Sequence, residues 1–190
     1  MPASPPDKKA RFLEAYAVCN PAVQRYCHAL AYDRADVEDL LQDILLSAFR
    51  HFDELGNAEQ LQHYLLRAAR NRAISLGRKR RRRGEWTERN AEHLRAGGAT
   101  GEQLADVHLL YRAIDKLPEA QRQAILLFEI ADRPLKEVAE QLGKSPAAVK
   151  MLLQRGRAGL RKRLTDRGTS PAAGELALAT LFLTAKLLTV

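Results

Sequence analysis

Cysteine, strand-like patterns and targeting signals are scarce in this sequence of 190 residues. Two cysteines, Cys19 and Cys27, are too few for a disulfide framework and favour a reducing compartment. The sequence opens on a basic, proline-containing stretch without a secretory signal, so we expect a cytoplasmic protein. No segment alternates apolar and polar residues with a period of two, which argues against β-sheets.

The residues that usually mark an enzyme or a metal centre are also missing. We find no glycine-rich phosphate loop and no Ser/His/Asp constellation, and the five histidines are scattered along the chain. Cys19, Cys27 and His28 lack the close ligand pair and the fourth ligand of a zinc site. We therefore expect no catalytic activity, no metal and no cofactor.

Positive charge and helix-forming residues are abundant. The chain has 31 Lys and Arg against 23 Asp and Glu, which gives a net charge of +8. This excess favours a polyanionic partner such as nucleic acid, although an anionic membrane would attract it too. Leucine, alanine, arginine and glutamate outnumber β-branched residues, so the sequence predicts an all-α protein of one or two small domains.

The segment from Leu135 to Leu164 has the pattern of a helix-turn-helix. Apolar residues recur at helical spacing up to Leu142, and Gly143 follows where a left-handed cap residue is needed. Ser145 and Pro146 then supply an N-cap and a first helical turn. Gly156, in the middle of the second helix, is expected to let the first helix of the motif approach closely.

The second helix of this motif has one apolar face and one basic face. Glutamine can pair with adenine, arginine and lysine with guanine, and flanking arginines can hold phosphates. We therefore expect the outward residues to contact DNA in the major groove. The alternative is an amphipathic hairpin with a solvated basic face. The candidate contacts are Ser145, Ala147, Lys150, Met151, Gln154, Arg155 and Arg157.

An acidic helix face stands out in this basic chain. Asp39, Gln42, Asp43 and Leu46 share one face of the helix predicted within residues 35–52, opposite a wide apolar stripe. Acidic side chains repel DNA, so this face predicts a docking surface for a basic, partly apolar protein. The alternative is a solvated face whose acidic residues favour the helix N-terminus.

A long helix is predicted from about Gln60 to Arg80, and six consecutive basic residues, 78–83, end it. Such a run either contacts the phosphates of a nucleic acid or is a solvated helix end that increases solubility, and we favour the phosphate contact. The candidate contacts with nucleic acid are Arg67, Arg70, Asn71, Arg78, Lys79, Arg80 and Arg81.

Breaker residues divide the chain into two helical domains and a tail. Asn20-Pro21 is expected to separate two supporting helices, and Leu117-Pro118 two others. We expect Pro171 to Gly174 to be a breaker, followed by an apolar segment too short to span a membrane, which packs on a domain or binds a partner. The predicted parts are a first domain (8–83), a flexible linker (84–101), a helix-turn-helix domain (102–168) and an apolar extension (169–190).

Taken in order, these segments resemble a bacterial sigma-70 family RNA polymerase sigma factor of the compact group IV, or extracytoplasmic-function (ECF), type. The resemblance covers about residues 10–166. Region 2.2 resembles DVEDLLQDILLSAFRHF, and regions 2.3 and 2.4 resemble LQHYLLRAARNRAISLGRKRRR. Region 4.1 is similar to LYRAIDKLPEAQRQAILLFEI, and region 4.2 to LKEVAEQLGKSPAAVKMLLQRGRAGLRKRL.

The resemblance implies a protein that binds core RNA polymerase and directs it to promoters. Domain 2 would open and read the minus-10 element, and domain 4 would read the minus-35 element. Asp39, Gln42 and Asp43 would dock on the clamp helices of the largest subunit. The basic residues of the long helix would hold the non-template strand, and the loop 53–59 would help capture a flipped base. An anti-sigma factor is a further partner that the resemblance implies.

The sequence also departs from the family pattern. Tyr64 stands where Trp is common, and Ser75 where Asp is common. Leu152 replaces an arginine of the usual recognition helix, so the minus-35 sequence cannot be read from this one.

Two other functions fit parts of the sequence. A helix-turn-helix regulator would bind an inverted repeat as a dimer without polymerase. A membrane-surface or partner-binding adaptor would use the basic run and the apolar tail.

Overall fold

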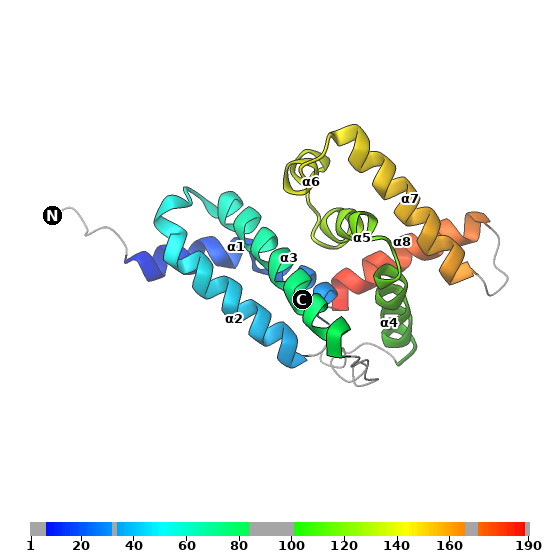
Figure 1. Cartoon of the computed structure of the whole chain (residues 1–190), viewed down its shortest axis with the longest axis horizontal. Coiled ribbons are helices and arrows are strands. Elements are labelled where there is room, and N and C mark those ends of the chain that lie inside the picture. Colours follow the sequence, from blue (N-terminus) through cyan, green and yellow to red (C-terminus); the bar gives the residue numbers. More distant parts are fainter. Residues whose placement is uncertain (1–6, 32–33, 84–100, 166–170, 189–190) are drawn as a thin grey trace. The chain divides into compact units, whose positions relative to one another are not determined.

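The all-α prediction is confirmed in the computed structural model, which describes residues 7–31, 34–83, 101–165 and 171–188. For residues 34, 35, 74–83, 101–105, 108, 165, 171–177 and 188 it describes the backbone alone. The chain forms two compact units, Met1–Trp86 and Thr87–Val190 (Figure 1). Residues 84–100, most of the predicted linker, lie outside the described residues, and the exact domain limits stay a prediction.

The first unit is a bundle of three long helices. These are α1 (Lys8–Leu30), α2 (Arg34–His51) and α3 (Ala58–Arg83), with a short 3-10 helix, η1 (Phe52–Glu54), after α2. Each long helix packs on both others, and Tyr26, Leu40, Leu61 and Leu65 are buried between them. Burial of this apolar surface is the main force that holds the bundle together.

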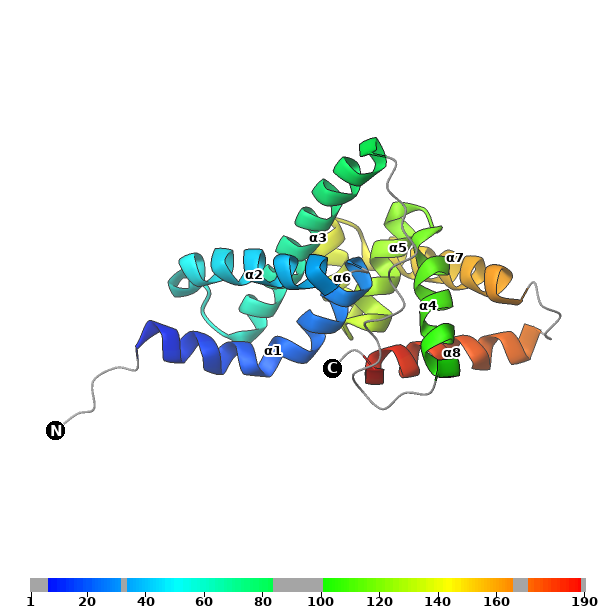
Figure 2. The same ribbon diagram turned by 90° about the horizontal axis from the view of Figure 1, so that it is seen from below.

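The expected break at Asn20-Pro21 is wrong, because α1 runs unbroken through Pro21. A proline inside a helix removes one backbone hydrogen bond and crowds the preceding turn, at a cost of about 3 kcal/mol. Cys19 and Val23, on either side of it, are both buried in the bundle. Their burial offsets the cost of the proline, and Figure 2 shows α1 changing direction along its length.

The second unit is built around a long central helix, α7. The unit consists of α4 (Gly101–Asp115), α5 (Glu119–Ile125), a π-helical turn η4 (Leu126–Ile130), α6 (Leu135–Leu142), α7 (Pro146–Thr165) and α8 (Pro171–Leu188). α7 packs against α4, α5, α6 and α8 (Figures 1 and 2). Leu110, Ile114, Ile125 and Leu160 are fully buried in this core.

The apolar tail forms α8 and belongs to the second unit. The expected breaker at Pro171 to Gly174 is wrong, because α8 begins at Pro171, where a proline is already set for the first helical turn. Leu178, Phe182 and Ala185 are buried where α8 packs on α4, α7 and η4, whereas Leu183 and Leu187 are exposed. Among the helices of the described residues, none combines the length and the apolar composition that a membrane-spanning segment needs.

Candidate nucleic-acid and protein interfaces

The acidic face of α2 is exposed to solvent. Asp39, Gln42, Asp43 and Leu46 are all exposed, and Leu46 retains 60% of its accessible surface. They lie on this outer face because the apolar stripe on the opposite side, including Leu40 and Ile44, is buried against the bundle. An exposed leucine beside two carboxylates suits a partner that is both basic and apolar.

One basic side chain of α3, Arg72, lies beside this acidic face. Arg67, Asn71 and Arg72 are exposed, and Arg70 is partly buried. One guanidinium nitrogen of Arg72 lies 2.5 Å from Asp43 Oδ2, so an ion pair joins the two helices. The sequence patterns did not indicate this pair, because it joins residues of two different helices.

The predicted basic run has a helical backbone. α3 continues to Arg83, three residues beyond the expected end. The side chains of Arg78, Lys79, Arg80 and Arg81 lie outside the described part of this helix, so their contact with nucleic acid stays a prediction. A helical backbone would point these side chains in several directions, because 3.6 residues complete one turn.

The segment that connects α2 to α3 is short and is held by hydrogen bonds and ion pairs. Asn57 caps α3 by accepting a hydrogen bond from the Gln60 backbone N–H at 2.9 Å, and Gln60 Oε1 accepts one from the Gly56 N–H at 2.7 Å. Asp53 pairs with Lys8 and Arg11 of α1 at 2.7 and 2.9 Å. The hydrogen bond from Lys8 is the largest of the effects that hold the pKa of Asp53 below its usual value.

The predicted helix-turn-helix is present as α6 and α7. Gly143 has a φ of 61°, in the left-handed region that glycine adopts without strain, and the Lys144 N–H donates to the Ala139 carbonyl at 2.9 Å. Ser145 Oγ accepts a hydrogen bond from the Ala148 N–H at 3.2 Å and caps α7. A DNA contact by Ser145 would therefore share its hydroxyl with this cap.

The outer face of α7 has the expected residues. Six of the seven candidate DNA contacts are exposed, namely Ser145 at the cap and Ala147, Lys150, Met151, Gln154 and Arg155 on α7. Val149, Leu153 and Leu160 are buried on the opposite face. The side chain of Arg157 is only 42% exposed, because it reaches back toward η4.

The expected role of Gly156 needs correction. A Cβ at this position would lie 2.9 Å from Ile125 Cγ1, so the close approach is made by α5 and not by α6, the first helix of the motif. The sequence marks the need for a small residue but not its neighbour, since only the tertiary packing determines which helix crosses there.

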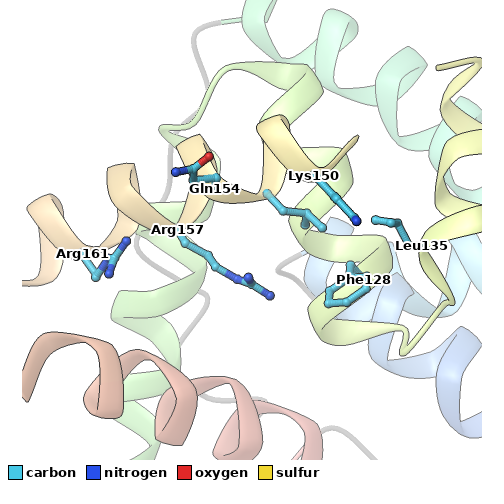
Figure 3. Close-up of a pocket in the computed structure, with 7 residues that line it drawn as sticks. Phe128, Leu135, Lys150, Gln154, Arg157 and Arg161 are labelled. Carbon is cyan, nitrogen blue, oxygen red and sulfur yellow. The ribbon is translucent and has the colours of Figure 1, made fainter. Parts of the chain in front are cut away.

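A groove lies beside α7, and two residues of η4 that the sequence patterns did not indicate, Phe128 and Glu129, contact Arg157 there. Arg157 Nε donates to Glu129 Oε1 at 2.7 Å, and the Arg157 guanidinium lies 5.7 Å from the centre of the Phe128 ring. The groove has a volume of about 460 Å³ (Figure 3). Its lining residues are Phe128, Leu135, Lys150, Leu153, Gln154, Arg157 and Arg161.

The described residues include no group of three or more His, Cys, Asp or Glu side chains placed to hold a metal ion. Cys19 and Cys27 are buried in the first unit. Burial raises the pKa of the Cys27 thiol to about 12, so this thiol stays protonated and unreactive at neutral pH.

Both units of the chain match known protein families. Residues 15–83 match the family model "Sigma-70 region 2", and residues 108–160 match "Sigma-70, region 4". The RNA polymerase sigma-E factor of Streptomyces antibioticus is 30% identical over 164 residues, which cover 86% of this chain and 90% of that protein. The ECF RNA polymerase sigma factor SigG of Mycobacterium tuberculosis is 28% identical, and the match covers 79% of this chain but only 48% of SigG.

A solved structure with a similar fold is the sigma factor RpoE of Bartonella quintana, in complex with the anti-sigma factor NepR. It has a TM-score of 0.67 and 26% sequence identity, and the match covers 81% of this chain and 96% of RpoE. The region 4 model ends at residue 160, so α8 lies beyond the part that the two family models describe.

Proposed function

Since this chain belongs to the sigma-70 family of RNA polymerase sigma factors, and within it to the ECF group, we propose that it binds core RNA polymerase in the cytoplasm and directs promoter recognition, melting and initiation. The observation that carries this proposal is the pairing of an exposed acidic face with a basic helix in one unit and a helix-turn-helix in the other. Neither unit holds all of these surfaces, so the function needs both.

The acidic face of α2 is the proposed polymerase-docking surface. Asp39, Gln42 and Asp43 would meet the clamp helices of the largest subunit, and Leu46 would add apolar contact. Opposite charges across an interface speed association and select the partner, while a buried apolar residue adds affinity. The exposure of all four side chains supports this assignment.

The basic side chains of α3 are proposed to hold the opened minus-10 element. Arg67, Arg70 and Asn71 would contact the non-template strand, and Arg78, Lys79, Arg80 and Arg81 would add phosphate contacts. Unstacking a base costs a few kcal/mol, so binding of the exposed strand favours melting. The exposed face of α7 is proposed to enter the major groove of the minus-35 element.

Two separate DNA sites explain a chain of two units. The two promoter elements lie roughly 25 base pairs apart, which is about 85 Å along B-DNA at ~3.4 Å per base pair. One domain of this size cannot contact both, whereas two units joined by a linker can.

An anti-sigma factor is a further proposed partner. RpoE of Bartonella quintana, which shares the fold, is found in complex with one. If this chain is regulated in that way, the protein recovered from uninduced cells should contain a second polypeptide in equal amount. Recovery with polymerase subunits alone would count against this partner.

The function is tested by transcription in vitro with the full chain, core RNA polymerase and a library of promoter fragments. We expect transcripts from a defined subset of promoters only when both proteins are present. Absence of initiation across the library would contradict the proposed function.

A further inference from the structure

A stripe of polar side chains runs along the side of α7 that faces the groove. Lys150, Gln154, Arg157 and Arg161 follow one another at spacings of four, three and four residues, which places them on one helix face. Figure 3 shows Arg157 reaching across from α7 toward Phe128 on η4. Three cations therefore line one groove, and an anionic group would be attracted to it.

One carboxylate holds the middle cation of this stripe. Glu129 Oε1 accepts from Arg157 Nε at 2.7 Å and lies 2.5 Å from Arg157 Nη2. The Glu129 side chain is only 15% exposed, so solvent screens this pair less than a surface pair. The Phe128 ring, 5.7 Å from the guanidinium carbon, supports the same orientation.

Among the described residues, the hydrogen-bond partner of Arg157 lies along one edge of its guanidinium. Arginine has five N–H donors in a fixed plane, and the Nε and Nη2 groups face Glu129. The Nη1 end remains to meet another acceptor. A planar group held by a carboxylate on one edge and a ring on its face loses little freedom when it binds a ligand.

The place of Arg157 along α7 indicates which part of DNA it meets. It lies 11 residues after the first residue of α7, Pro146, or about 16 Å along the axis at 1.5 Å per residue. In helix-turn-helix proteins the N-terminal residues of the recognition helix contact the bases. A side chain this far along the helix is placed for the DNA backbone.

We propose that Glu129 is a positioning residue that fixes Arg157, so that the remaining guanidinium donors, together with Lys150 and Arg161, receive a backbone phosphate of promoter DNA. This inference rests on the proposed function, because α7 must lie against DNA. It assigns a role to an acidic residue that pairs with a lining residue of the groove, where its charge alone would repel DNA.

A positioning role and a purely electrostatic role of Glu129 predict opposite effects of its removal on DNA affinity. If only net charge mattered, removal of this carboxylate would tighten DNA binding at every salt concentration. If Glu129 positions Arg157, its removal frees a flexible side chain that must be ordered again on binding. Ordering one such side chain costs about threefold to tenfold in affinity.

The test uses the full chain assembled with core RNA polymerase and a promoter duplex recovered from the library. Apparent affinities are measured at several salt concentrations for wild type and for the Glu129→Ala, Arg157→Ala and doubly substituted chains. We expect Glu129→Ala to weaken binding threefold to tenfold. Arg157→Ala should also weaken binding and reduce the slope of log affinity against log salt concentration by about one. In the Arg157→Ala background, Glu129→Ala should cause no further loss of affinity.

Two further variants separate positioning from charge and from folding. Glu140→Ala removes the same charge from an exposed position on α6, and we expect unchanged or slightly tighter binding. Glu129→Gln keeps the shape of the side chain, so it gives a test even if Glu129→Ala does not fold, but it replaces the charge-assisted hydrogen bond to Arg157 by a neutral one of about half the strength, which holds the guanidinium less firmly. We expect it to bind at least twofold more weakly than wild type.

Binding by Glu129→Gln as tight as wild type or tighter would overturn the positioning role. If Glu129→Ala lowers DNA affinity equally in the wild-type and Arg157→Ala backgrounds, the positioning role is overturned as well. If the variants give either of these results while the wild-type chain initiates transcription normally, this inference alone is refuted. If the wild-type chain never initiates transcription, the proposed function is refuted.

Discussion

Asp43 of α2 and Arg72 of α3 form an ion pair, with Oδ2 and Nη2 2.5 Å apart, at the boundary between the acidic face and the basic helix. Both side chains are about half exposed, and a pair of this kind contributes about 0.2–1 kcal/mol. A polymerase that binds Asp43 can therefore separate the pair at little cost. Arg72 would then become available to an anionic ligand.

Charge reversal on α2 should impair polymerase binding without unfolding the protein. Asp39→Lys combined with Asp43→Lys replaces attraction by repulsion at the proposed interface, and we expect core affinity to fall tenfold or more, about 1.4 kcal/mol. Glu14→Lys, at an exposed position on α1, is the matched control and should bind normally. Wild-type affinity of the double variant in a core-binding titration would count against the docking assignment.

The sequence predicted the helical surfaces better than the contacts between helices. The acidic face of α2 and the helix-turn-helix could be predicted because periodicity and cap residues act within one segment. The Asp43–Arg72 and Glu129–Arg157 pairs, and the neighbour of Gly156, could not, because each joins different helices. Pro21 was predicted to break the helix because the cost of a proline inside a helix can be read from the sequence. The burial of Cys19 and Val23, which offsets that cost, cannot.

Gly156→Ala should destabilise the second unit. Helix propensity alone predicts a gain of about 1 kcal/mol, whereas a methyl group 2.9 Å from Ile125 Cγ1 requires repacking that costs about 1–3 kcal/mol. We therefore expect a lower midpoint for thermal unfolding, followed by circular dichroism. A higher midpoint would show that α5 does not cross α7 so closely.

The tail helix should stabilise the second unit through its buried face. Phe182 is 5% exposed, and Phe182→Ala should cost about 3–5 kcal/mol of unfolding free energy. Leu187, on the same helix, is 70% exposed, and Leu187→Ala should change stability by less than about 0.5 kcal/mol. Denaturant titration of both variants compares the two faces, and equal effects would contradict the packing of α8.

The tail is also expected to modulate transcription. Deletion of Gly174 to Val190 removes most of α8, including Lys186, which pairs with Asp132 just before the helix-turn-helix. We expect altered promoter binding or solubility in the truncated chain. Unchanged transcription, solubility and partner binding would rule this role out.

Acid should destabilise the first unit through His28. Burial lowers the pKa of His28 below its ordinary value of 6.5, so the folded state favours the neutral ring. As pH falls below about 6.5, the unfolded state takes up the proton first and stability decreases until the folded pKa is passed. Thermal midpoints measured across this range should fall for wild type and less steeply for His28→Gln. Equal slopes would exclude His28 as the cause.

Protection of a promoter fragment by the full chain, with and without core RNA polymerase, tests the division between polymerase docking and DNA recognition most directly. We predict little specific protection by the chain alone, and an asymmetric footprint over two separated elements once polymerase is added. A symmetric operator protected by the chain without polymerase would contradict the sigma-factor function and favour a dimeric helix-turn-helix regulator.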